Sequence, residues 1–434
     1  MAAKNFFGRK KEYKLQDVFA VKVGGPPPLT YVKRNHVDEE LEYALDSDGS
    51  VLLYGASKQG KTSLWNMCRD EGDVAKSRKF IPIPCQDLKS TRQIYESMLK
   101  GAGYDIEVSR SESYVNGGGI RGKVKSGIPS ALSVAIEGSE ENKTTQEFTY
   151  RSLDLDYSNV SDIVLALNGL GRLVFVLEDF HYIPDDVQKQ FSNDFKGIVE
   201  NSSCIFIIVG AWASGNRMTL YNGEMAQRIT SVRADEWSTE QLREVIGKGE
   251  DLLNIEFAEE VKEILITECR GNVSILQEIC SRVCYKNNVK KTQKKKIMID
   301  GGCLDEEIKK VIGGYDERYR NFIRDYCAGK KNKLHIRKRI LNVIFNTDVN
   351  RLVEGISYAD LVEEINKKFP APINSGNITQ ALNTMVEVQR KKNIRPVVIG
   401  YDRPGNRLVV LDPTFITWLR HQNKEALIKM VSVS

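Results

Sequence analysis

A glycine-rich segment near the start of the chain has the residue types and spacing needed to bind phosphate. An apolar run, Val51 to Tyr54, leads into Gly55, four further residues and then Gly60-Lys61-Thr62. This is the pattern G-x-x-x-x-G-K-[ST] between a predicted strand and a predicted helix. Glycines let the backbone curl so that its N–H groups face an anion, and the following helix N-terminus adds partial positive charge. The residues expected to bind the phosphates of ATP are Gly55, Ala56, Ser57, Lys58, Gln59, Gly60, Lys61, Thr62 and Ser63.

Two side chains of this segment have separate expected roles. Lys61 is placed to reach the β- and γ-phosphates, and Thr62 to coordinate Mg²⁺. The alternative, a chance glycine loop, is disfavoured because the segment lies between a strand and a helix.

A second buried strand, 173–177, ends in the acidic pair Glu178-Asp179. A carboxylate at the tip of such a strand can hold Mg²⁺ beside bound phosphates, and a second one can activate the attacking water. The usual order is Asp then Glu, and here it is inverted. We assign Glu178 to the metal and Asp179 to the water, and both are metal candidates together with Thr62. The alternative is a solvated acidic pair at a strand end.

Arg228 precedes another short apolar stretch, 229–232. It is placed to project towards the nucleotide of a neighbouring subunit as an arginine finger, which would require a homo-oligomer in the ATP state. Arg217 is a competitor for this role, and an ordinary surface arginine is the alternative for each.

The bulk properties describe an ordinary globular protein. The 434 residues include 63 Lys+Arg and 58 Asp+Glu, a net charge of +5, which by itself is too weak to indicate nucleic-acid binding. No run of about 18 apolar residues predicts a membrane span. The eight cysteines form no C-x-x-C pair, so we expect no zinc site, and Cys280 and Cys284 are expected to be core thiols. A reduced, cytoplasmic setting fits these features.

Short apolar strands alternate with helical patterns over the first half of the chain. Strands expected near 51–54, 80–83, 173–177, 204–209 and 229–232 are apolar on both faces. This is typical of a parallel sheet covered by helices on both sides, and therefore of an α/β fold. We divide the chain into a basic, Pro-rich arm at 1–30, an α/β core at 31–236 with an insertion at 103–156, a helical lid at 237–289, a linker with a helix at 290–332 and a last domain at 333–434.

The insertion interrupts the α/β pattern, and we expect a weak β-hairpin there with disordered flanks. Ser238 and Gln241 form a capping box that begins the first lid helix.

The last domain follows the plan of a winged helix. Three amphipathic helices are expected from residues 335, 357 and 377, followed by strands at 396–401 and 407–411. Polar and basic residues on the third helix and the wing could contact DNA, and the same fold can also dock a partner protein. The candidate contacts are Gln380, Asn383, Arg390, Arg403 and Arg407.

Taken together, these segments resemble the AAA+ and STAND ATPases, and most of all the subgroup of initiator and origin-recognition ATPases. The resemblance covers roughly residues 31–430. Tyr31-Val32-Lys33-Arg34 resembles the adenine-side motif of that subgroup, which implies a nucleotide contact for Arg34. Two features depart from the family. Only Arg270 could serve as a sensor arginine in the lid, and the 103–156 insertion lies outside the common core.

The resemblance and the motifs lead to one main hypothesis, an ATP-driven molecular switch that couples nucleotide state to a winged helix. Binding or hydrolysis of ATP–Mg²⁺ would change the angle of the lid and move the last domain. Two alternatives stay open at this stage. One is a nucleotide-gated DNA-binding regulator without hydrolysis. The other is a P-loop phosphotransferase, which would need an acceptor pocket and a further catalytic base.

Overall fold

The computed structural model describes residues 11–20, 27–106, 121–126, 151–156, 159–212, 215, 217–329, 335–369 and 373–432. The predicted flanks of the insertion and most of the predicted N-terminal arm lie outside these residues, and so does the side chain of Arg217.

A five-stranded parallel sheet forms the centre of the first half of the chain. Its strands, in spatial order, are β2 (Lys79–Pro84), β6 (Leu173–Glu178), β7 (Ile205–Val209), β1 (Ser50–Tyr54) and β8 (Ile229–Arg233). All five expected strands are therefore present within one or two residues of their predicted bounds. Since the strands are parallel, their carboxyl ends meet at one edge, where the phosphate loop follows β1.

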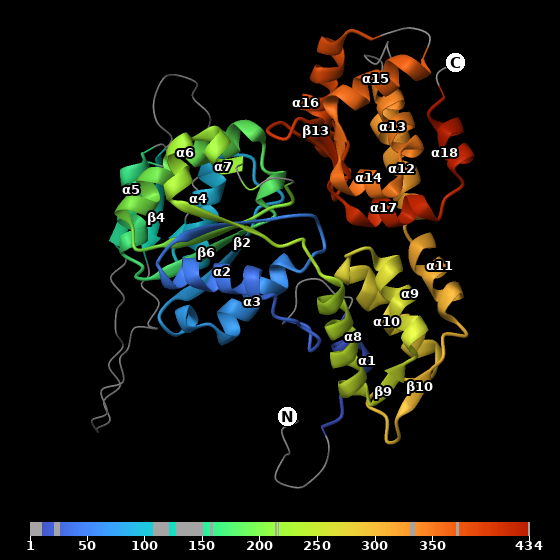
Figure 1. Ribbon diagram of the computed structural model, residues 1–434. Coiled ribbons are helices and arrows are strands. Elements are labelled where there is room, and N and C mark those ends of the chain that lie inside the picture. Colours follow the sequence, from blue (N-terminus) through green and yellow to red (C-terminus); the bar gives the residue numbers. More distant parts are fainter. Residues whose placement is uncertain are drawn as a thin grey trace.

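Helices cover both faces of this sheet (Figure 1). Along β1, Leu52 packs into one core and its neighbours Val51 and Leu53 into another, as the alternation of side chains in a strand requires. One core is closed by α2 and α3, and the opposite core by α4, α5 and α6. The helices of these layers and the short turns between them are α2 (Asn35–Asp46), α3 (Lys61–Glu71), η1 (Asp73–Lys76), α4 (Thr91–Ala102), α5 (Val160–Asn168), η3 (Phe180–Tyr182), α6 (Asp185–Asn201), α7 (Arg217–Tyr221) and η4 (Gly223–Gln227).

The described residues of the insertion form an antiparallel pair of strands. Strands β4 (Arg121–Ser126) and β5 (Arg151–Asp156) pair antiparallel, and the short β3 (Asp105–Ile106) extends them to a three-stranded sheet.

The helical lid follows the last strand of the sheet. Within its predicted bounds it contains α8 (Thr239–Leu253), β9 (Ile255–Phe257), α9 (Glu259–Cys269) and α10 (Val273–Lys286). Two elements of the predicted linker pack onto it, because β10 (Ile297–Ile299) pairs in parallel with β9 and α11 (Leu304–Gly313) contacts α10. The capping box at the start of α8 is confirmed, since the Ser238 side chain accepts from the Gln241 amide and the Gln241 side chain accepts from the Ser238 amide. Cys280 and Cys284 are fully buried in the lid core, as predicted.

Part of the segment predicted to be an N-terminal arm is packed into the lid. Helix α1 (Leu15–Val18) packs against α8 and α10, and Leu15, Val18 and Phe19 are buried in the lid core. Gly249 on α8 makes room for this contact, because a Cβ atom there would lie 2.1 Å from the Phe19 ring. The prediction was wrong here because it rested on the basic and Pro-rich residues on either side of this short apolar segment.

The last domain has the predicted winged-helix elements. Helices α15 and α16 are followed by the hairpin β12–β13, and β11 completes a sheet in the order β11-β13-β12. The elements of this region are α12 (Asp316–Cys327), α13 (Ile336–Asn346), α14 (Val349–Glu354), β11 (Ile356–Ser357), α15 (Tyr358–Lys368), α16 (Ser375–Lys391), β12 (Ile399–Asp402), β13 (Arg407–Val410), α17 (Pro413–Arg420) and α18 (Lys424–Met430).

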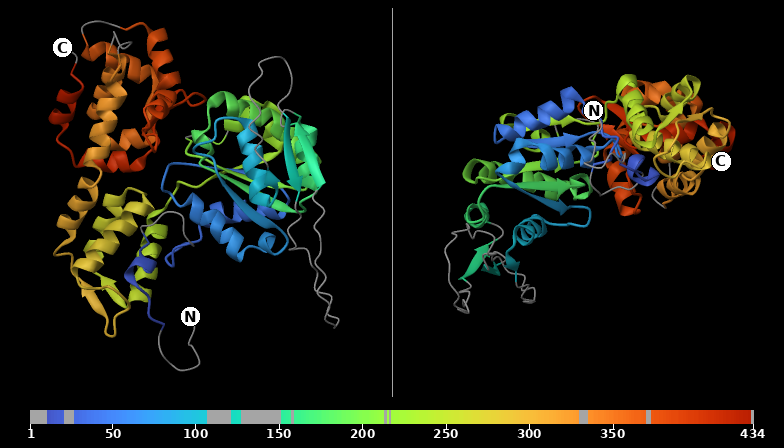
Figure 2. Two further views of the ribbon diagram at one scale, coloured as in Figure 1. Left: turned by 180° about the vertical axis from the view of Figure 1, so that it is seen from behind. Right: turned by 90° about the horizontal axis from the view of Figure 1, so that it is seen from below.

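The lid and the winged-helix region share one continuous hydrophobic core and stack beside the α/β core (Figures 1 and 2). Helix α16 and the β12–β13 hairpin lie on the side that faces the α/β core. Among the described helices, none has the length and apolar character needed to cross a membrane.

The contact between Phe19 and Gly249 leads to a stability prediction. We expect Phe19→Ala to lower the free energy of unfolding of the lid by about 3–5 kcal/mol, because it leaves a cavity in a closed core. Urea denaturation followed by circular dichroism measures this. Tyr43→Ala, which removes an aromatic side chain that is 75% exposed, is the matched control and should have little effect. An equal loss in both variants would contradict the packing of α1.

Candidate functional site

The phosphate loop has the backbone shape that its sequence predicts. Gly55 and Gly60 have φ angles of 128° and 84°, which side chains other than glycine rarely adopt, and α3 begins directly at Lys61. A Cβ atom on Gly55 would also lie 2.8 Å from Cγ of Asp235. The Asp235 carboxylate accepts a hydrogen bond of 2.8 Å from the Ala56 amide and so fixes the first turn of the loop.

Lys61 is folded back onto its own loop. Its ammonium group donates to the carbonyl oxygens of Gly55, at 2.9 Å, and Ala56. Burial lowers the pKa of Lys61 to about 8, while the carboxylates of Asp235, Asp179 and Glu178 favour its charged form. The ammonium is thus held inside the loop, next to the position expected for phosphate.

Glu178 lies beside Thr62, as the metal assignment requires. The Thr62 hydroxyl is 3.3 and 3.4 Å from the two carboxylate oxygens of Glu178. The indole N–H of Trp65, one turn further along α3, also donates to Glu178. Burial raises the pKa of Glu178, and this indole N–H partly offsets the effect by favouring the charged carboxylate. Sequence analysis missed Trp65, although its position three residues after Thr62 places both on one helix face.

Asp179 follows in a strained backbone conformation. Its φ of 56° is left-handed, and it begins the turn η3. Burial raises the pKa of Asp179, and the charge of Lys61 opposes this. Within the described residues, no group of three or more His, Cys, Asp or Glu side chains could hold a metal ion by itself. A Mg²⁺ ion held by Thr62 and Glu178 would therefore need further ligands from bound phosphates or water, as is common for Mg²⁺ in nucleotide sites.

Arg34 reaches the phosphate loop only through another side chain. It is fully buried, donates to the Ala234 carbonyl oxygen at 2.8 Å, and its guanidinium lies 4.5 Å from the Trp237 ring centroid. The Trp237 indole in turn lies 3.4 Å from the carbonyl oxygen of Gln59 in the loop. Trp237 and Asp235 were both missed, because nothing local in the sequence marks them as partners of a loop about 180 residues earlier.

A cavity of about 510 Å³ lies beside this loop, between the α/β core, the lid and the winged-helix region. It is large enough for a small-molecule ligand. Gln59 and Asp235 line it from the core, Trp237 and Arg270 from the lid, and Val410 and Ile416 from the last domain.

Arg228 lies at the opposite end of the sheet from the phosphate loop. It precedes β8, whose first residue pairs with Ser50 at the start of β1. Its guanidinium forms an ion pair with Glu200 and donates to the Glu224 carbonyl oxygen. The structure thus separates Arg228 from the loop of its own chain, and its role towards a neighbouring subunit stays a prediction.

The winged-helix region touches the phosphate loop directly. The Ser57 amide lies 3.4 Å from the Leu411 carbonyl oxygen at the end of β13, a long contact. The Lys58 ammonium lies 5.2 Å from the centroid of Tyr315, at the start of α12. Burial lowers the pKa of Lys58, and the charge of Asp412 opposes this. Two successive residues of the loop therefore meet the second half of the chain.

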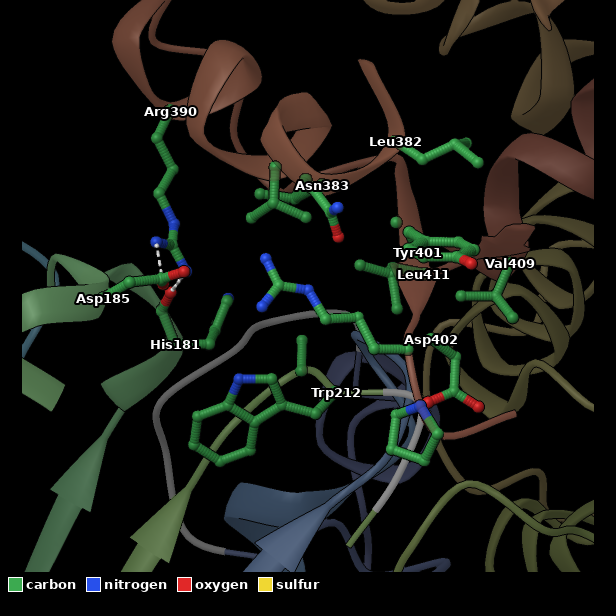
Figure 3. A pocket seen from close by; sticks show the side chains of 16 residues that line it. His181, Asp185, Trp212, Leu382, Asn383, Arg390, Tyr401, Asp402, Val409 and Leu411 are labelled. Carbon is green, nitrogen blue, oxygen red and sulfur yellow. Dashed lines mark hydrogen bonds and ion pairs between the residues drawn. The ribbon is translucent and has the colours of Figure 1, made fainter. Parts of the chain in front are cut away.

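Part of the surface predicted to read DNA faces the α/β core (Figure 3). Arg390 donates one hydrogen bond to the Asp185 carboxylate, at 3.1 Å, and another to the His181 carbonyl oxygen. Its side chain is only 14% exposed. In this conformation Arg390 therefore joins the winged-helix domain to the α/β core. It is not free to contact DNA, contrary to the prediction. Asn383 lies on the same side of α16, whereas Gln380 and Arg403 are exposed and Arg407 donates to Glu354 within its own domain.

Comparisons with known proteins identify the fold. No family model and no curated protein sequence matches the chain. The Walker-type ATPase of Pyrococcus abyssi is similar in structure, with a TM-score of 0.54 and 14% identity over 93% of this chain and 99% of that one.

This likeness confirms that the chain has the fold of a Walker-type ATPase, and with it the predicted α/β class with a parallel sheet. Also matched are the ORC2 protein of Aeropyrum pernix (TM-score 0.47, 12% identity, 96% of each chain) and Cdc6p of Pyrobaculum aerophilum (TM-score 0.42, 13% identity, 95% of this chain and 98% of that one).

The hydrogen bond between Trp65 and Glu178 can be tested by removing only its donor. If the chain hydrolyses ATP, we expect Trp65→Phe to reduce Mg²⁺-dependent ATP turnover roughly ten-fold while ATP affinity changes little, because the ring stays and Glu178 loses one charge-assisted hydrogen bond. Trp418→Phe, a distant indole that donates to Asp316, is the control. Turnover equal to that of the unmodified protein would contradict the role of Trp65.

Proposed function

We propose that this chain is an ATP-binding and ATP-hydrolysing switch that couples nucleotide state to the position of its winged-helix domain. The observation that carries the proposal is the approach of the Ser57 amide to the Leu411 carbonyl oxygen, because it joins the phosphate loop to the domain that would be moved.

Nucleotide binding would use groups that now form hydrogen bonds within the protein. The loop amides and the Lys61 ammonium would face the phosphates, so Lys61 would leave the carbonyl oxygens of Gly55 and Ala56. The adjoining cavity would receive the rest of the nucleotide. Thr62 and Glu178 would hold Mg²⁺, which supplies positive charge against the charge that develops on the phosphates.

Hydrolysis is the finer part of this proposal. Asp179 would accept a proton from the attacking water and Lys61 would stabilise the transferred group. Arg228 of a second copy would complete the site in an oligomer. The inverted Glu178-Asp179 order, which places the shorter Asp side chain at the position of the base, favours one alternative, a nucleotide-gated regulator that binds ATP without turning it over.

The coupling would work through shared contacts. When the loop closes on phosphate, Ser57 and Lys58 would shift away from Leu411 and Tyr315. The lid and the winged helix share one core, so we propose that they move as a unit and release α16 from the α/β core. The exposed face of α16 and the wing would then bind DNA or a partner protein. The domain divisions at residues 31, 237, 290 and 333 belong to the same proposal.

ATP binding is the first test. We expect Lys61→Ala to weaken ATP–Mg²⁺ binding about 10- to 150-fold, the effect of losing one charged hydrogen-bond donor to phosphate, measured by titration calorimetry. Lys79→Ala removes an exposed lysine of β2 and is the control. Release of phosphate from ATP by the unmodified protein but not by Lys61→Ala would support hydrolysis. If neither protein releases phosphate, the alternative of a regulator without hydrolysis is favoured. If Lys61→Ala binds ATP as tightly as the unmodified protein, the proposal is refuted.

Release of the winged helix is the second test. We expect Arg390→Ala to destabilise the closed arrangement by about 1–3 kcal/mol, because its side chain makes charged hydrogen bonds to Asp185 and the His181 backbone. Energy transfer between dyes on the α/β core and on α18 should then fall without nucleotide. Arg407→Ala, which breaks a contact inside the winged-helix domain, should leave it unchanged. A closed arrangement in both variants would contradict the coupling.

A further inference from the structure

A groove of about 690 Å³ lies on the lid, between α1, α10 and α11, and we call it the lid groove. Helix α1 lies across the face of the lid that is turned to the viewer in the left panel of Figure 2. The lid groove shares no lining residue with the cavity beside the phosphate loop, and it contains none of the predicted DNA contacts of the winged helix. Five basic side chains line it, namely Lys14, Arg282, Lys286, Lys290 and Lys310.

The two carboxylates of the lid groove do not neutralise this lining. Glu307 is only 4% exposed and accepts a hydrogen bond of 2.8 Å from Lys310. Glu278 accepts from the Tyr315 hydroxyl at 3.1 Å and lies 3.6 Å from Arg282. The cations of the lining outnumber its carboxylates by five to two, so the groove is positively charged.

The basic segment 290–296 is fixed to the lid rather than carried on a loose linker. Lys14 and Lys291 form an antiparallel bridge. Beside it the Tyr13 amide donates to the Thr292 hydroxyl at 2.9 Å, across a separation of 279 residues. The Thr292 amide donates in return to the Tyr13 carbonyl oxygen at 2.9 Å. Two basic segments from opposite parts of the chain are therefore held side by side.

This segment extends the positive charge beyond the lid groove. Its exposed lysines are Lys290, Lys291, Lys294, Lys295 and Lys296. Glu12 pairs with Lys291 and Glu256 with Lys296, whereas Lys14, Lys290, Lys294 and Lys295 take part in no ion pair in the described part of the chain. Because a residue spans at most about 3.6 Å of extended chain, Lys294 lies within roughly 14 Å of Lys290. Positive charges gathered in this way repel one another, and a bound polyanion would remove the repulsion.

An exposed aromatic ring stands among these cations. Tyr285 on α10 lines the lid groove and is 61% exposed, and the Lys290 ammonium lies 5.4 Å from its ring centroid. A nucleobase can stack on such a ring while the phosphates next to it contact the ammonium groups. A membrane surface is too flat to enter the groove, and neither a lipid headgroup nor an acidic peptide brings a base to the ring.

We propose that the lid groove binds single-stranded nucleic acid, with one base stacked on Tyr285 and the phosphates paired with Lys14, Lys290 and Lys294. A duplex keeps its bases stacked on one another, so it would gain nothing from Tyr285. Binding at this groove requires neither the proposed nucleotide switch nor the winged-helix surface.

The ligand is tested by comparing polyanions with and without bases. Fluorescence anisotropy of the full chain without ATP would use labelled oligothymidylate and oligouridylate of about 15 nucleotides, with inorganic polyphosphate and phosphatidylserine vesicles as competitors. We expect DNA, RNA or both to bind, and polyphosphate to compete roughly 5- to 150-fold less well than the unlabelled oligonucleotide, the effect of one stacked base. No binding at about 50 mM salt, or equal competition by polyphosphate or vesicles, would overturn the proposal.

The ring is tested by Tyr285→Leu. This variant should bind the oligonucleotide roughly 5- to 150-fold more weakly and leave binding of polyphosphate unchanged, because only the base contacts the ring. Tyr43→Leu, which removes a 75% exposed ring from α2, is the matched control and should bind normally. Equal affinity of the two variants for the oligonucleotide would refute stacking on Tyr285.

The charges are tested by combining Lys290→Gln with Lys294→Gln. The slope of log affinity against log salt concentration should become shallower by about 1.4, since each phosphate contact of a single strand contributes about 0.7. Lys79→Gln with Lys189→Gln removes two exposed lysines of the α/β core and is the charge-matched control. An equal change in both pairs, or a loss of binding in Arg403→Gln alone, would refute the lid groove as the site. ATP binding by each variant, measured alongside, separates failure of this proposal from failure of the nucleotide switch.

Discussion

The need to satisfy buried polar groups in the phosphate loop governs the arrangement around it. A loop that exposes several amides and one ammonium group must give them partners whether or not phosphate is present. Here Lys61 turns to the carbonyl oxygens of its own loop, Ala56 to the Asp235 carboxylate, and Ser57 towards the Leu411 carbonyl oxygen. Partners drawn from three regions of the chain make the loop the point at which those regions meet.

Much of the fold could be predicted because it depends on local patterns. The five core strands are continuous apolar runs, and helices such as α8 begin at capping residues that the sequence shows directly. Helix α1 escaped prediction because a four-residue helix has too little sequence for a periodic pattern. Its place in the core depends on a partner, Gly249, that lies far along the chain.

The candidate site could be predicted only where its chemistry is contained in a motif. Lys61, Thr62 and Glu178 follow from residue types and spacing, and the structure places Thr62 beside Glu178. Asp235 and Trp237 carry no local signal, since their partners Ala56 and Gln59 are 179 and 178 residues away. The prediction that Arg390 is exposed was wrong for a related reason. The surface pattern of a single domain does not reveal which of its faces another domain covers.

Strand β8 gives the sheet a further property. At its carboxyl end the chain continues into Asp235, which buttresses the phosphate loop, and directly before its amino end stands Arg228. Strand β8 pairs with β1 along its whole length, so it links Asp235 at one end of the sheet to Arg228 at the other. If a second copy contacts Arg228, as proposed, this edge strand is the covalent connection between that contact and the support of the phosphate loop.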